Sequence, residues 1–348
     1  YDKNKRLCSG AYDYKRDGCP DTYGWVADLV NGGFALPQEM LCPTNPLKGS
    51  EKLNDMVGVT DSVGSTGRLP NDLTFRLSEG NCTPSGILAG SPDTETRGAA
   101  VADYLLSRGY GSNYVSSWFL VRSAVKLASN SSSGVDLTMN ASDCKGLKGG
   151  QGPLTIPMVE TSQVATQAIP LLGDGAPGDV HEAVLSQTIP GFIVAGERLV
   201  EAFNDGPAHV ASDDIDLIDD TDVILDATTG VHAWAFDILP TPETPAGVDI
   251  GTDGGAAGSG DNTIWLQDTR DWMALHGGGA KLNCNLLMAD GSVINVIDEN
   301  GDSFLNPGFQ GSFDSGDGYL DGTVELTPTQ CYSGASIERF ATIKGSFE

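Results

Sequence analysis

One stretch near the C-terminal end, residues 276–306, constrains the fold of this chain more than any other. It reads HGGGAKLNCNLLMADGSVINVIDENGDSFLN. Two short apolar runs, residues 286–289 and 292–297, flank the pair Asp290-Gly291. Asp-Gly between apolar runs is typical of a β-hairpin, because a type I′ turn needs positive φ at both central residues. We therefore predict an antiparallel hairpin here, closed by a type I′ turn.

The composition limits the classes of partner that this chain can bind. The 348 residues include 47 acidic and 20 basic side chains, which gives a formal net charge of −27. Charge of this sign repels nucleic acids and anionic membrane surfaces, so we exclude both as partners, and it favours divalent cations. No run of 18 apolar residues occurs, so the sequence as given predicts no transmembrane helix.

Helical spacing is clearest near the start of the chain. Trp25, Val26, Leu29 and Val30 recur at helical spacing, and residues 99–107 predict a second short helix. An aromatic run over residues 114–121 resembles a strand, and residues 323–347 read as two or three further strands.

These elements predict an α+β fold. We expect a helical segment over residues 1–33 that packs on an antiparallel β-sheet. Residues 34–348 would then form a β-rich head with large loop-rich β insertions, which could divide near residues 153 and 251. The 45 glycines and 18 prolines agree with many turns and long connections.

The cysteines favour disulfide bonds over metal binding. They are scattered along the chain without a C-x-x-C pair, which argues against a zinc site or a thioredoxin-like redox centre. Scattered cysteines in an acidic, glycine-rich chain favour disulfides in an oxidising compartment over buried free thiols. The odd number leaves at least one thiol unpaired. The seven are Cys8, Cys19, Cys42, Cys82, Cys144, Cys284 and Cys331.

The segment after the hairpin resembles part of a calcium-binding loop. Asp298, Asn300 and Asp302 occupy positions 1, 3 and 5 of an EF-hand loop, and Asn306 occupies position 9. The loop lacks the glycine expected at position 6 and the glutamate expected at position 12, which excludes a complete EF-hand.

A partial calcium loop could take ligands from the following segment. The nearest carboxylates there are Asp314, Asp317 and Asp321. Oxygen donors without nitrogen or sulfur select Ca²⁺ over transition metals. The alternative is a solvated acidic turn, and the motif alone leaves both interpretations open.

The sequence contains no recognisable catalytic motif. It has neither a G-x-S-x-G nucleophile elbow nor a phosphate-binding loop. His276 is the one candidate general base, but the sequence shows no partner that would tune its pKa. We therefore interpret His276 as a structural residue that bonds the backbone at a glycine-rich turn, and we expect a protein that is not an enzyme.

The hairpin stretch resembles a bacterial family of prepilin-like proteins, which pair an N-terminal cleavage/methylation helix with a C-terminal H-X9-DG motif. Here the motif would begin at His276 and end at Asp290-Gly291. Thirteen residues separate the histidine from the aspartate, where the strict motif has nine. The extra four residues fall around residues 281–285.

Other segments are similar to the same family. Residues 42–46, Cys-Pro-Thr-Asn-Pro, look like its Cys-Pro-Ser-Asp/Asn-Pro element, and residues 113–117 resemble its Asn-Tyr strand. Residues 8–25 look like the segment that follows the family's long helix. The Gly-Phe-Thr-Leu-Ile-Glu motif and its apolar helix are absent from this sequence, so the resemblance covers mainly the globular head.

This resemblance implies a pilin-like fold and a non-enzymatic role. The expected function is a pilin- or pseudopilin-like structural subunit of an extracellular or periplasmic filament. Its partners would be copies of itself or other pilin-like subunits, and only the missing N-terminal helix would contact a membrane. Major pseudopilins often carry calcium in their C-terminal region, which strengthens the Ca²⁺ hypothesis. Disulfides would staple the loops, with Cys8 paired to Cys19 or Cys42.

A second hypothesis is an extracellular module that binds a glycan or another ligand through surface loops. Its binding platform would be made of aromatic side chains, which could equally belong to the core. The candidates are Trp118, Trp234, Trp265 and Trp272.

Overall fold

The computed structural model describes residues 5–58, 69–129, 137–139, 144–211, 214–218, 265–278, 281–310 and 318–337. Within these ranges, helices and antiparallel sheets are both present, which confirms the α+β class. Across the same ranges, no helix is both long enough and apolar enough to span a membrane.

The helices are short. The α-helices are α1 (Tyr14–Asp17), α2 (Trp25–Asn31), α3 (Lys52–Val57), α4 (Glu95–Tyr104), α5 (Trp118–Arg122) and α6 (Ile156–Thr161). The 3₁₀ helices are η1 (Pro37–Met40), η2 (Asn71–Ser78), η3 (Leu106–Arg108) and η4 (Thr166–Ala168). Helices this short are not stable alone, so tertiary packing holds them.

The strands form three antiparallel sheets. The strands are β1 (Tyr114–Ser116), β2 (Leu127–Ser129), β3 (Leu137–Met139), β4 (Pro170–Asp174), β5 (Asp205–Ala211), β6 (Asp214–Leu217), β7 (Leu266–Asp268), β8 (Asn283–Met288) and β9 (Val293–Ile297). The largest sheet has the order β1-β4-β8-β9, the second β6-β5-β7, and β2 pairs with β3. We call the four-stranded one the main sheet.

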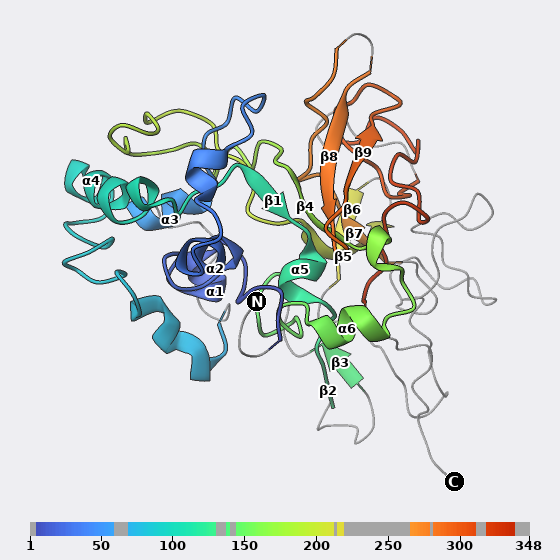
Figure 1. The fold of residues 1–348 in the computed structure, drawn as a ribbon, viewed down its shortest axis with the longest axis horizontal. Helices are drawn as coiled ribbons and strands as arrows, with labels where there is room; N and C mark the ends of the chain where they lie inside the picture. The colour runs from blue at the N-terminus through green and yellow to red at the C-terminus, as the bar shows by residue number, and fades with distance from the viewer. Residues whose placement is uncertain are drawn as a thin grey trace.

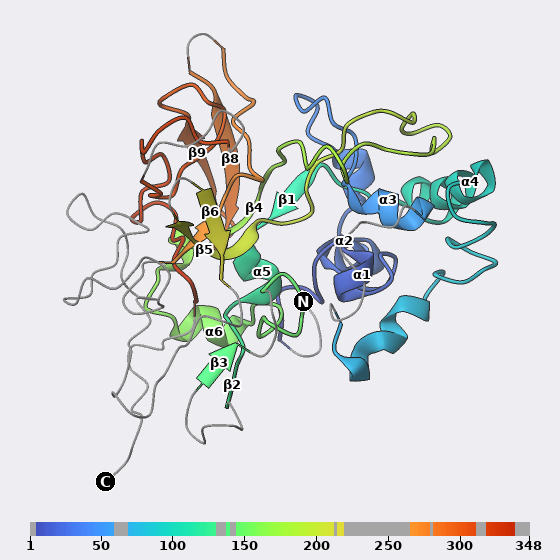
Figure 2. The ribbon, with the colours of Figure 1, turned by 180° about the vertical axis from the view of Figure 1, so that it is seen from behind.

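Helices and strands occupy different sides of the molecule. Helices α1 to α4 gather on one side, and the β8-β9 hairpin stands on the other (Figures 1 and 2). Strands β1 and β4 lie between them. Strand β1 therefore joins the early helical part of the chain to a sheet whose other strands come from much later in the sequence.

The predicted hairpin is present, but its turn is of a different type. Strands β8 and β9 pair from Asn283↔Ile297 to Leu287↔Val293. Gly291 has a φ of +83°, whereas Asp290 keeps a negative φ, so the turn is not type I′. Instead, the Gly291 amide donates to Met288 O at 2.9 Å, and Gly291 supplies the left-handed residue. A turn of this kind with glycine third is the usual three-residue hairpin loop.

The N-terminal helical prediction is confirmed in part. Helix α2 covers the periodic positions, and Trp25 and Val26 are buried on its inner face. Helix α4 confirms the second prediction but begins at Glu95, four residues early, because Thr94 caps it by accepting a hydrogen bond from the Arg97 amide.

One strand prediction holds only over its first three residues, and a second fails over residues 323–337, while residues 338–347 lie outside the described residues. The expected strand over residues 114–121 stops after Ser116, because the Ser117 hydroxyl accepts from the Leu120 amide at 3.1 Å and caps helix α5. Residues 323–337 contain turns and one isolated bridge in place of the expected strands. The Glu325 and Leu326 amides both donate to Asn306 O, which holds this segment against residues 298–306, called the acidic loop below.

The main sheet buries one face. Along β8, Cys284, Leu286 and Met288 are fully buried and alternate with less buried residues. This alternation follows from the period of two in a β-strand. Trp272 packs against the same face, and its indole nitrogen donates to Val115 O at 3.0 Å. Each buried side chain of this size contributes about 1.5–3 kcal/mol to folding.

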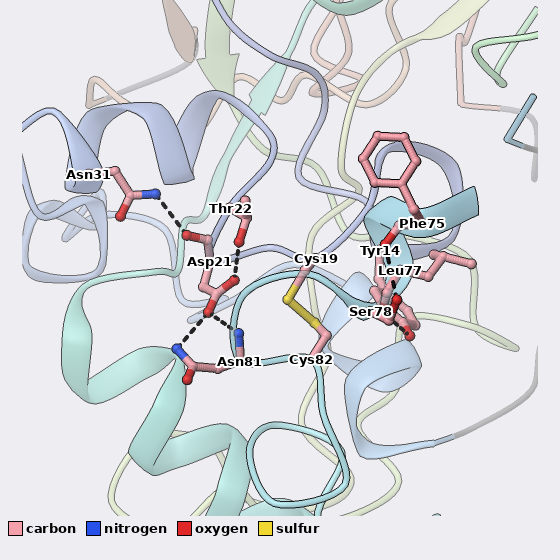
Figure 3. The surroundings of a disulfide bond; sticks show 10 residues. All are labelled: Tyr14, Cys19, Asp21, Thr22, Asn31, Phe75, Leu77, Ser78, Asn81 and Cys82. Carbon is pink, nitrogen blue, oxygen red and sulfur yellow. Dashed lines mark hydrogen bonds between the residues drawn. A yellow bond between two sulfur atoms is a disulfide. The ribbon is translucent and has the colours of Figure 1, made fainter. Parts of the chain in front are cut away.

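A disulfide joins two segments on the helical side. Cys19, just after α1, is bonded to Cys82 (Figure 3). One disulfide is thus confirmed, but the expected pairing of Cys8 with Cys19 or Cys42 is wrong. The preference for disulfides over buried thiols is also wrong for the other five cysteines, which are Cys8, Cys42, Cys144, Cys284 and Cys331. Cys8 is a free, buried thiol that contacts Leu120 O. Sequence spacing carries no information on the distance between Cα atoms, which decides pairing.

Candidate functional site

The second face of the main sheet carries a mixture of apolar and polar side chains. Leu172, Leu287 and Val293 lie side by side on β4, β8 and β9, because their registers pair Leu172 with Leu287 and Leu287 with Val293. Asp174 follows Leu172 by two residues and therefore projects from the same face. Tyr114 on β1 pairs with Asp174.

His276 meets Asp174 at the end of this face. The Nε2 atom of His276 lies 2.9 Å from Asp174 Oδ2 and 3.6 Å from the Sγ atom of Cys42. Cys42 and Asp174 are almost fully buried, and the His276 side chain is 23% exposed. Three segments that are far apart in the sequence thus place a thiol, a carboxylate and an imidazole together. We call these three residues the Cys–Asp–His cluster.

Backbone contacts hold each member of the cluster in place. The Asn113 side chain accepts from the Cys42 amide at 2.9 Å and donates to Cys42 O at 3.2 Å. His276 exchanges two backbone hydrogen bonds with Asn283 at the start of β8. Asp174 Oδ2 accepts from the Asn285 amide at 3.1 Å. The cluster is therefore fixed by the sheet and by the loop that carries Cys42.

The cluster forms part of the wall of a cavity of about 720 Å³. Most of the other lining side chains are apolar and come from α2, from the loop after it and from the second face of the main sheet. Trp25, Leu172 and Leu287 are examples. A cavity of this size and character can accept a small molecule.

The cluster does not have the geometry of a catalytic triad. In a triad, the histidine contacts the nucleophile through one ring nitrogen and the carboxylate through the other. Here Cys42 and Asp174 approach the same nitrogen of His276. Burial, followed by the nearby Asp174 carboxylate, also raises the pKa of the Cys42 thiol, which keeps it a weak nucleophile at neutral pH.

The ring of His276 was expected to bond the backbone, and the structure shows that it contacts a buried carboxylate instead. The sequence carried no signal for this contact, because Cys42 and Asp174 lie 234 and 102 residues away (276 − 42 and 276 − 174). Only the pairing of β4 with β8 brings Asp174 to the histidine.

The structure brings together part of the predicted calcium loop. The side-chain amide of Asn300 donates to Asp302 Oδ2 at 2.9 Å and to Asp321 Oδ1 at 3.1 Å. Asp298 is buried and anchors the loop, because its carboxylate accepts from the amides of Gly301 and Ser303. Asp314 and Asp317 lie outside the described residues.

Position 6 of the loop adopts the backbone conformation that a calcium loop requires. An EF-hand has an invariant glycine there to make a sharp turn. Ser303 occupies this position with a φ of +75°, in the left-handed region that favours glycine. The chain therefore makes the turn at position 6 without the glycine whose absence counted against the motif.

Asn306 and Glu325 join the end of the acidic loop to the segment around residue 325. Asn306 Oδ1 accepts from the amides of Gly308 and Phe309, so this oxygen already has two donors. The Asn306 amide donates to Glu325 Oε2 at 2.9 Å. The other oxygen, Oε1, is buried and has no hydrogen-bond partner among the residues that the structure describes.

Glu325 could not be predicted from the loop motif in the sequence. It stands outside the loop numbering, 16 residues after the phenylalanine that replaces the position-12 glutamate (325 − 309). Burial raises its pKa to about 7, and repulsion from Asp302 and Asp298 adds to this shift. The carboxylates of Asp302 and Asp298 therefore lie close enough to Glu325 to disfavour its charged form.

Comparison with protein-family models, curated proteins and solved structures gave no match to this chain.

The tryptophans proposed as a binding platform belong to the core where the structure describes them. Trp118, Trp265 and Trp272 are all at most 1% exposed. The Trp118 indole nitrogen donates to Cys144 O at 3.1 Å, as a buried indole requires. Trp234 lies outside the described residues.

A second cavity, of about 340 Å³, is lined mainly by charged side chains. Glu51 is 4% exposed there and forms an ion pair with Lys52. Burial and the neighbouring Glu201 carboxylate nevertheless raise the pKa of Glu51 from 4.5 to about 7. The protein therefore keeps a proton on Glu51 under mildly acidic conditions.

The raised pKa of Glu51 predicts that the free energy of unfolding depends on pH. A carboxyl whose pKa is higher in the folded state stabilises the fold below pH 4.5, and this contribution is lost as the pH rises through about 7. Between pH 4.5 and pH 8, we expect the unfolding free energy of the wild type to fall by about 3 kcal/mol more than that of Glu51→Gln. Urea unfolding at both pH values measures it, and exposed Glu39→Gln is the control. A wild-type slope retained in Glu51→Gln would contradict the assignment.

Proposed function

We propose that this chain is the head of a pilin-like, non-enzymatic structural subunit that assembles into a filament outside the cytoplasm. The proposal rests on one observation, which is the close packing of the segments that resemble the prepilin-like family. Residues 42–46, 113–117, 276–278 and 290–291 are scattered through the sequence, yet in the structure they contact one another or belong to the main sheet and its hairpin. Segments that belong to one architectural unit are expected to pack in this way.

The contacts between these segments are specific. Asn113 binds the backbone of Cys42 on both sides and also donates to Leu47 O at 2.9 Å. The side-chain amide of Asn45 donates to Gly175 O at 2.8 Å, directly after β4. His276 then reaches Asp174 from the start of the β8-β9 hairpin. The motif side chains thus tie the Cys-Pro-Thr-Asn-Pro loop to the main sheet, which is a structural use of polar residues.

The disulfide is a second support. Disulfides persist in oxidising compartments such as the periplasm and the cell exterior. The Cys19–Cys82 bond therefore favours export of the chain, as a filament subunit requires.

Deletion of the gene tests the proposal. We expect the deletion strain to lose a class of surface filament, and expression of the wild-type gene to restore it. Unchanged filaments in the deletion strain, together with saturable binding of the purified chain on a glycan array, would contradict the filament role and favour a binding module.

We further propose that the C-terminal loop binds Ca²⁺ through Asp298, Asp302 and Glu325, with Asn300 and Asp321 at its edge. The support is the buried Glu325 oxygen that lacks a hydrogen-bond partner in the described residues. An unpaired buried acceptor is costly, and a cation would satisfy it. All the candidate donors are oxygens, which suits Ca²⁺.

Calcium should therefore stabilise the fold. At a Ca²⁺ concentration about 100 times the Kd, we expect a gain of about 2.7 kcal/mol in unfolding free energy over the EDTA-treated protein. Asp302→Asn should abolish most of this gain, because it removes one anionic ligand. Asp290→Asn, in the nearby hairpin turn, is the matched control and should keep it. Equal melting temperatures of the wild type in Ca²⁺ and in EDTA would contradict the site.

A further inference from the structure

The Cys–Asp–His cluster combines three features of a metal site. Its three ligand atoms, one from each side chain, all lie within 4.8 Å of one another. They belong to three different chemical types, and two of the three residues are almost fully buried. We propose that Cys42, Asp174 and His276 bind a transition-metal ion, with Zn²⁺ as the preferred ion. This inference is independent of the filament proposal and of the calcium loop.

The approach of Cys42 and Asp174 to one ring nitrogen of His276 favours a metal site over a hydrogen-bond relay. Cys42 Sγ and Asp174 Oδ2 both approach Nε2 of His276, so the three donor atoms form one compact group. Tetrahedral zinc, with bonds of about 2.3 Å to sulfur and 2.0–2.1 Å to nitrogen, separates these two atoms by roughly 3.6 Å. The observed separation of Cys42 Sγ from His276 Nε2 is 3.6 Å. The 2.9 Å contact to Asp174 would lengthen slightly as the ion replaces the shared proton.

The donor set selects the type of ion. A thiolate and an imidazole bind zinc and similar borderline-soft ions, whereas Ca²⁺ and Mg²⁺ take oxygen ligands. One thiolate, one carboxylate and a neutral imidazole carry a total charge of −2. A divalent cation would neutralise this charge in a region that is largely shielded from water, where an unpaired charge is costly.

Neighbouring groups already hold the ligands in position. Asn113 fixes the backbone of Cys42, and Asn283 fixes that of His276. The Asn285 amide donates to Asp174 Oδ2 and so orients the carboxylate. Outer contacts of this kind are typical of metal sites, where they set the direction of the ligands. The site therefore needs little rearrangement to bind an ion.

Three protein ligands leave one position of a tetrahedral ion free. Structural zinc sites use four protein ligands, whereas sites open to exchange use three and a water. The cluster lines the 720 Å³ cavity, so the fourth position is available to water or to a donor atom of a molecule bound there. The sequence argued against zinc because it contains no C-x-x-C pair. The structure assembles the ligands from separate segments instead.

Cobalt substitution tests the proposal on the whole chain. We expect Co²⁺ to bind the reduced wild-type protein with a stoichiometry of one and to give a thiolate-to-cobalt charge-transfer band. Zn²⁺ should displace it, and excess Ca²⁺ should not. Cys42→Ser should lose the band, and His276→Asn should weaken Zn²⁺ binding at least about tenfold. The matched controls are Cys8→Ser, a thiol that is 2% exposed like Cys42, and the exposed His181→Asn.

The wild-type spectrum can overturn the proposal even if a variant fails to fold. A charge-transfer band in the wild type and in Cys8→Ser, but not in Cys42→Ser, supports the site. Absence of the band from folded wild-type protein would overturn it. Equal bands in wild type and in folded Cys42→Ser would also overturn it, because another thiol would then be the ligand.

Discussion

Replacing Arg122 with methionine is expected to destabilise this protein by about 3–5 kcal/mol, because it leaves a buried carboxylate without its counter-charge. Arg122 and Asp17 are both fully buried, and the guanidinium donates to the two carboxylate oxygens at 3.0 and 2.7 Å. The pair joins the end of α1 to the end of α5. Urea unfolding of wild type and variant measures the loss.

Two further variants separate this effect from simple loss of an arginine. In Asp17→Asn/Arg122→Met no charge is left buried, so we expect the double variant to be more stable than Arg122→Met alone. Exposed Arg108→Met, which removes a guanidinium that lies 5.0 Å from the Tyr104 ring, should cost less than about 1 kcal/mol. A loss below 1 kcal/mol in Arg122→Met would show that the pair contributes little.

Removal of the disulfide, by Cys19→Ala/Cys82→Ala, is expected to cost about 4 kcal/mol, since the bond closes a loop over a sequence separation of 63 residues. The segment that it anchors has little apolar packing of its own, because none of the residues of η2 is buried. Polar contacts supplement the bond: the Asp21 carboxylate accepts from both the backbone and the side-chain amides of Asn81 (Figure 3).

Reducing conditions provide the control for this prediction. Dithiothreitol should lower the unfolding free energy of the wild type to about that of the double variant, and should leave the double variant unchanged. Cys8→Ala, which removes a thiol that is not cross-linked, should respond to reductant as the wild type does. Equal stabilities of wild type and double variant in non-reducing buffer would contradict the expected contribution.

Local patterns in the sequence predicted the elements that depend on local interactions. The β8-β9 hairpin follows from alternating apolar residues around Asp290-Gly291, and α2 follows from helical spacing. The type of turn was wrong because Gly291 alone takes the left-handed conformation. The strand expected over residues 114–121 was wrong because one hydroxyl, that of Ser117, starts a helix inside an apolar run.

Contacts between distant segments could not be predicted in the same way. Asp174 reaches His276 only through the pairing of β4 with β8, and Cys42 reaches it through a loop held by Asn113. Glu325 likewise joins the acidic loop through the backbone contacts of Asn306. No local pattern predicts these contacts, because the histidine cluster is assembled by the order of strands in the main sheet and Glu325 is placed by its backbone hydrogen bond to Asn306.

Immunogold electron microscopy of the cells that produce this protein tests the central claim most directly. With antibodies against the purified chain, a filament subunit should give gold particles in rows along thin surface filaments. The labelling should disappear in a strain that lacks the gene. Labelling confined to the cell interior, or filaments that carry no gold while the cell body does, would contradict a role as a pilin-like subunit.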